Sequence, residues 1–93
     1  MAEFDLVEDW MSQLRESLDL TGLGPVDVPA LLSVVREAAH GIVHPAGPVA
    51  MFAAGYATAR AGGSAESMEE ILRQVGEAAT DFAARHPHEG KDD

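Results

Sequence analysis

The stretch that decides the fold is residues 64–85, which reads SAESMEEILRQVGEAATDFAAR. Its apolar side chains recur every three or four residues, the period of one face of an α-helix. They are Met68, Ile71, Leu72, Val75, Ala79 and Phe82. Ser64 can cap the first turn through its hydroxyl, and two glycines precede it. The pattern therefore predicts a helix over 65–85 with one face buried. On its exposed surface, Glu66 and Glu70 are expected to pair with Arg73.

Three further helices are predicted upstream, over 5–20, 28–43 and 48–61, with Asp5 and Asp27 as candidate capping residues of the first two. Glycines and a proline in 21–25 (TGLGP) separate the first two. The segment 44–48 (HPAGP) separates the second from the third, because proline pushes the preceding residue out of helical geometry and suits a first helical turn. No strand pattern and no repeat interrupts this series. The sequence thus predicts an all-α fold, a compact four-helix bundle-like domain.

The third predicted helix differs from the others because it is rich in alanine and has almost no polar face. A helix of that kind is expected to be covered over most of its circumference. Gly55 lowers its intrinsic helix propensity, and a close helix–helix approach there is the expected compensation. Across the chain, the side chains expected to be largely buried are Trp10, Leu14, Leu31, Val35, Phe52, Leu72, Val75 and Phe82.

The chain has 93 residues, which suits one domain. Residues 1–86 are expected to form it, and residues 87–93, which lack apolar side chains apart from a proline, to form a flexible acidic tail. Residues 1–10 carry four acids, unlike an export signal, and the most apolar stretch is too short to span a bilayer. A cytoplasmic location is expected, with no membrane partner.

The formal net charge is −10, from sixteen acids against six bases. This sign disfavours nucleic acid as a partner, because neutralised phosphates supply most of the affinity in such complexes. The chain has no cysteine, which removes disulfides, thiolate metal sites and cysteine nucleophiles. No spacing of serine, histidine and acids supports a catalytic constellation. The sequence thus predicts a protein that is not an enzyme.

The candidate site is the corner between the second and third predicted helices. It consists of Arg36, His40, His44, Pro45 and Pro48. His40 and His44 are four residues apart, a spacing that can serve a metal, but a site needs a third ligand and Pro45 disfavours a continued helix. We therefore expect no metal and no cofactor. A rigid turn accounts for the prolines without requiring Arg36 or His40.

The corner also carries a resemblance. The segments Ala39-His40-Gly41 and Pro45-Ala46-Gly47-Pro48, with the later Ala61-Gly62-Gly63-Ser64, resemble an uncharacterised bacterial helical domain family, and the similarity runs from about Trp10 to Phe82. The family pattern has a His-Gly pair, then a basic residue before Pro-Ala-Ala-Pro. Here His44 takes the basic position and Gly47 replaces the second alanine. With this departure, the resemblance does not support a metal site shared by two histidines.

The family that the chain resembles occurs alone or as a C-terminal extension of molybdenum-cofactor guanylyltransferase. It is associated with molybdoenzymes of the formate dehydrogenase type and with their maturation. The resemblance implies a non-catalytic accessory module whose partner is a molybdoenzyme or a cofactor-synthesis enzyme. One alternative is a binding protein in which Arg36 and His40 hold a small anionic ligand. Another is a structural homo-oligomer that packs through its alanine-rich helix.

Overall fold

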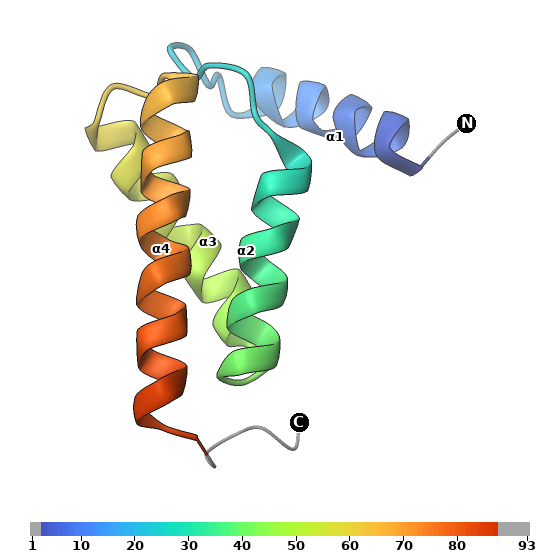
Figure 1. The fold of residues 1–93 in the computed structure, drawn as a ribbon. Helices are drawn as coiled ribbons and strands as arrows, with labels where there is room; N and C mark the ends of the chain where they lie inside the picture. Colours follow the sequence, from blue (N-terminus) through green and yellow to red (C-terminus); the bar gives the residue numbers. More distant parts are fainter. Residues whose placement is uncertain (1–2, 88–93) are drawn as a thin grey trace.

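The computed structural model describes residues 3–87, and they form four α-helices without a strand (Figure 1). The helices are α1 (Glu3–Ser17), α2 (Val28–Gly41), α3 (Ala46–Arg60) and α4 (Ala65–Arg85). The all-α prediction is confirmed. Of the expected tail, only Pro87 belongs to the described residues, and 88–93 lie outside them. Within the described part, no helix is both long enough and apolar enough to cross a membrane.

Three of the helices form the bundle. α2, α3 and α4 each pack against the other two, with α3 crossing behind the α2–α4 pair, whereas α1 projects sideways from one end (Figure 1). The core comprises Val34 from α2, Ala54 from α3, and Met68 and Leu72 from α4. None of the residues of α1 is buried. The four predicted helices therefore make a three-helix bundle with one helix set apart.

The predicted caps of α2 and α4 are confirmed. The carboxylate of Asp27 accepts a hydrogen bond from the N–H of Ala30 at 3.1 Å, and the hydroxyl of Ser64 accepts one from the N–H of Ser67 at 3.0 Å. Each bond satisfies an amide that the first helical turn leaves without an intrahelical partner. Asp5, considered from the sequence as the start of the first helix, instead lies within the first turn of α1.

The close approach between helices occurs at Gly47 rather than at Gly55. A Cβ atom on buried Gly47 would lie 2.9 Å from Cγ1 of Val35 and 3.1 Å from its carbonyl oxygen. A Cβ atom on Gly55 would meet nothing within 4 Å. The expectation for Gly55 is therefore wrong, and Gly47 is the residue that lets α3 begin against α2.

The expected burial of large side chains is confirmed only in part. Leu72 is buried, and four others are partly buried: Leu14, Leu31, Val35 and Val75. Trp10 is 59% exposed, because α1 lies away from the bundle. Phe52 is 84% exposed, because α3 buries only its small residues. Phe82 is 41% exposed, and its ring stacks on that of His86 with centroids 4.3 Å apart.

The loops at the upper end of Figure 1 are joined to each other. The N–H of Gly24, between α1 and α2, donates to the carbonyl of Gly63, between α3 and α4, at 2.7 Å. The guanidinium of Arg15 donates to the carbonyls of Leu23 and Gly24 at 2.9 and 2.6 Å. These bonds connect the last turn of α1 to the bundle through the loop.

Candidate functional site

The corner predicted from the sequence lies where α2 ends and α3 begins, and all of its residues are exposed: Arg36, His40, His44, Pro45 and Pro48. The structure brings His40 and His44 together, with ring centroids 6.5 Å apart and planes at 27°. Arg36 lies one turn before His40 on α2 and makes no hydrogen bond or ion pair within residues 3–87. The corner therefore presents a histidine pair and an unpaired cation to solvent.

The histidine pair lacks what a metal site needs. Nowhere in the part of the chain that the structure describes do three histidine, cysteine or acidic side chains come close enough to hold a metal ion. A protein zinc site requires at least three such ligands. That the protein binds no metal stays a prediction, which metal analysis of untagged protein can check.

The start of α3 offers few backbone donors to an anion. The N–H groups of Ala46 and Gly47 donate to carbonyls of the preceding turn at 2.9 and 3.3 Å, and that of Val49 donates to Pro45 at 3.4 Å. Pro48 has no N–H. A helix N-terminus binds anions through amides that lack other partners, so this geometry gives the anionic-ligand hypothesis little support.

An apolar surface that was not predicted from the sequence continues from the corner along α3. It consists of Pro45, Pro48, Val49, Phe52 and Tyr56, and we refer to it as the α3 stripe. These residues follow the spacing i, i+3, i+4, i+7 and i+11, which places them on one helical face, and every one is exposed.

The far end of the α3 stripe is flanked by a cation, since the guanidinium carbon of Arg60 lies 5.8 Å from the centroid of the Tyr56 ring. A signal for the stripe was present in the sequence. Three of the four large side chains of α3 share this face, while the residues that α3 buries are Gly47, Ala54 and Thr58.

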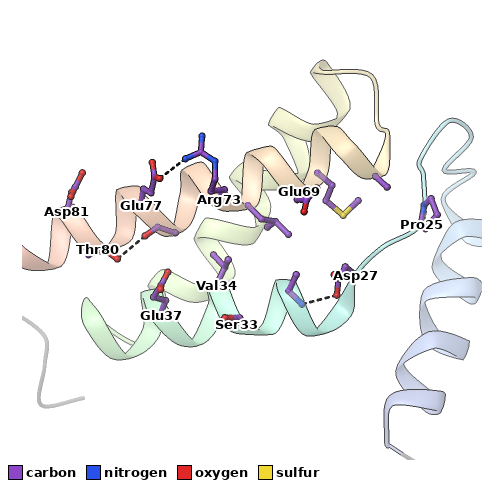
Figure 2. A pocket seen from close by; sticks show the side chains of 15 residues that line it. Pro25, Asp27, Ser33, Val34, Glu37, Glu69, Arg73, Glu77, Thr80 and Asp81 are labelled. Carbon is purple, nitrogen blue, oxygen red and sulfur yellow. Dashed lines mark hydrogen bonds and ion pairs between the residues drawn. The ribbon is translucent and has the colours of Figure 1, made fainter.

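A second feature is the groove between α2 and α4, with a volume of about 940 Å³ (Figure 2). Acidic side chains line it from both helices and from the start of α2: Asp27, Glu37, Glu69, Glu77 and Asp81. The only cation in its lining is Arg73, which already pairs with Glu70 and Glu77 at 2.5 Å each. No corner residue lines the groove, so the structure separates it from the predicted site.

These features define the class of the protein as a small all-α domain with an exposed apolar helical face. Over residues 3–90 the chain matches the family model described as Domain of unknown function (DUF6457), and the protein belongs to that family. Neither the curated proteins nor the solved structures contain a match to the chain.

Proposed function

We propose that this protein is a non-catalytic interaction module that acts in the cytoplasm, in molybdenum-cofactor synthesis or in the maturation of a molybdoenzyme of the formate dehydrogenase type. The observation that carries the interaction part is the exposed α3 stripe, with Phe52 at 84% exposure at its centre. The molybdenum part is supported by the resemblance carried by the His40-Gly41 and Pro45–Pro48 segments.

The α3 stripe has the composition of an interface centre. Burying a side chain such as phenylalanine contributes about 1.5–3 kcal/mol relative to leaving it in water, and α3 leaves Val49, Phe52 and Tyr56 without that contribution. Aromatic side chains are also enriched among the residues that dominate binding energy. A protein partner that covers the stripe would supply the missing burial.

In this proposal the corner forms the polar edge of the same interface, next to the α3 stripe. His44 directly precedes Pro45 of the stripe, and His40 is stacked beside His44. Interfaces surround an apolar centre with polar, solvent-accessible residues, and arginine is enriched in them. Pro45 and Pro48 restrict the backbone where the stripe begins, which reduces the conformational entropy lost on binding. In this proposal the chemistry belongs to the partner, a cofactor-synthesis enzyme or a molybdoenzyme.

The test is affinity purification from the native host, with mass spectrometry of the proteins that copurify. We expect the wild-type protein to capture a molybdoenzyme or the guanylyltransferase, and Phe52→Ala to lose it. Truncating an anchor residue reduces affinity by about 2 kcal/mol, or roughly thirtyfold. Glu69→Ala is the matched control, because Glu69 is exposed in the α2–α4 groove, away from the stripe. Equal capture by Phe52→Ala would contradict the proposal.

Arg36→Ala and His40→Ala separate the corner from the stripe. Both side chains are exposed, so we expect the variants to remain folded with only slightly lower melting temperatures. If the corner contributes to recognition, capture of the partner decreases. If both variants capture the partner as the wild type does, the corner is a structural turn and recognition rests on the stripe alone.

The homo-oligomer alternative also has an observation in its favour. Gly55 follows Phe52 and precedes Tyr56 on α3, and no atom lies within 4 Å of a Cβ placed on it. Small residues let helix backbones approach closely, so a second copy could pack its α3 here. Light scattering after size exclusion would show a dimer that Phe52→Ala dissociates.

A further inference from the structure

A second cavity lies on the side of α3 that faces α1. Its volume is about 560 Å³, and Met11 of α1, Leu20 and Leu23 of the following loop, and Met51 and Gly55 of α3 line it. No lysine, arginine or histidine lines this pocket, and its only charged lining residue is Asp19. Its size and apolar character are those of small-molecule sites, which span about 300–1,000 Å³.

One polar side chain in this pocket is unusual. Thr58 is 3% exposed, the only buried polar or charged residue within 3–87, and it lines the pocket. Its hydroxyl makes no hydrogen bond with any part of the described chain. No fully occluded side-chain nitrogen or oxygen in that part lacks a partner. The Thr58 hydroxyl is therefore not fully occluded, and Thr58 is one of the residues that line the pocket.

We infer that this pocket, which we call the Thr58 pocket, binds a small, neutral, mostly apolar molecule whose single hydroxyl or carbonyl group hydrogen-bonds to Thr58. The apolar lining selects the body of the ligand, because burial of apolar surface drives its entry. The lining disfavours an anion, since a carboxylate or phosphate would find no cation there and would face Asp19. It also disfavours a cation, which would lose its hydration to a lining whose single charged residue, Asp19, is exposed to solvent. Three methionines, Met11, Met51 and Met68, allow the wall to adapt to the ligand's shape.

The site differs from the α3 stripe, so the inference is independent of the proposed function. Met51 and Gly55 line the pocket, whereas Phe52 and Tyr56 do not. A ligand in the Thr58 pocket would bind beside the surface proposed for the protein partner without occupying it.

The experiment uses phenol and toluene, two rings of similar shape of which only phenol has a hydroxyl. Binding to the full chain is followed by NMR of the methionine methyl groups, because three methionines line the pocket. We expect both probes to shift these signals, with phenol bound about three- to tenfold more tightly, the factor that one hydrogen bond supplies. Absence of shifts with both probes at millimolar concentration would overturn the inference.

Two variants assign the binding to this pocket. Thr58→Val keeps the shape but removes the hydroxyl, so we expect the preference for phenol to disappear while toluene still binds. Gly55→Leu fills the pocket from a position where a Cβ meets no atom within 4 Å, and a leucine also favours the helix. We expect this substitution to lower the affinity of the protein for both probes by at least about tenfold. An unchanged preference in Thr58→Val, or wild-type binding by Gly55→Leu, would refute the assignment.

Further variants test whether a change in probe binding is specific to the Thr58 pocket. Ala53→Leu adds the same side chain to an exposed position of α3 that does not line the pocket, and should bind both probes as the wild type does. Circular dichroism checks that each variant is folded, and Ala59→Leu is a second blocking variant from an exposed lining position. Phe52→Ala should retain probe binding, so loss of the partner and loss of the ligand are distinguishable.

Discussion

Arg73 on α4 holds two carboxylates of its own helix. It pairs with Glu70 three residues before it and with Glu77 four residues after it, and its guanidinium also donates two hydrogen bonds to Glu70. The sequence predicted the pairing with Glu70, whereas Glu66 takes no part in it. The hydrogen bonds from Arg73, aided by one from Gln74, lower the pKa of Glu70 to about 2, and the same pairing raises the pKa of Arg73.

We expect an NMR titration to find the Glu70 carboxyl with a pKa far below its ordinary value of 4.5, and Arg73→Ala to move it back toward that value. Because the pKa is depressed in the folded state, the pairing stabilises the fold fully above pH 4.5, and the effect is lost as the pH falls toward 2. Gln74→Ala should produce a smaller rise. A titration unaffected by Arg73→Ala would show that the pair does not persist in solution.

Truncation to alanine should destabilise the protein strongly at Leu72 and hardly at all at Phe52. Leu72 is 5% exposed in the core, so Leu72→Ala is expected to lower the free energy of unfolding by about 2–5 kcal/mol. Phe52→Ala removes a larger side chain but an exposed one, and should change that free energy by no more than about 0.5 kcal/mol. Urea denaturation measures both in the monomeric protein. A large loss of stability in Phe52→Ala would mean that the ring is buried in solution.

At the residue level, the sequence predicted the features that depend on neighbouring residues. The caps at Asp27 and Ser64 were predictable because capping needs one side chain and an amide three residues on. The close approach at Gly47 was not, because it depends on Val35 in another helix. The proximity of His40 and His44 was foreseeable from their spacing. The burial of Thr58 with an unpaired hydroxyl was not, because it depends on how the helices pack.

At the level of elements, α1 differs from the other helices. It is amphipathic, yet it buries no residue, and its last turn is attached to the bundle through the bonds of Arg15 to the following loop. Helices with few buried contacts open locally at low free energy.

We expect the amides of α1 to exchange with deuterium faster than those in the middle of α2, α3 and α4. Arg15→Ala should accelerate exchange in α1 while leaving the other three helices protected, because the core residues come from α2, α3 and α4. Hydrogen-exchange mass spectrometry measures both effects. Protection in α1 equal to that of the bundle, in a monomeric sample, would be inconsistent with this arrangement.

The helices themselves were largely predictable, and their packing was not. All four were expected close to their observed bounds, because periodicity and breakers are local signals. The predicted burial of α3 failed because a helix that is apolar all round needs a cover, and the sequence does not say whether the chain supplies it. In this fold the bundle covers Ala54 and Thr58, while Phe52 remains open.

For the whole molecule, the charge of −10 makes a prediction about partners. Acidic side chains crowd the α2–α4 groove (Figure 2). Arg36 and Arg60 belong to different helices, α2 and α3. We expect no salt-dependent binding to duplex DNA at micromolar protein and physiological salt, measured by fluorescence anisotropy. Binding that weakens steeply with added salt would contradict this expectation.

The contact between the α1–α2 loop and the α3–α4 loop has a consequence for how the sequence can vary. A Cβ on Gly63, whose φ is +79°, would lie 2.7 Å from the carbonyl oxygen of Gly22, and one on Gly24 would lie 2.9 Å from the nitrogen of Ala65. Both obstacles are backbone atoms, which cannot rotate out of the way as a side chain can. A side chain at either glycine therefore requires a shift of the other loop's backbone, so we expect substitutions there to be accepted together with a compensating change about forty codons away.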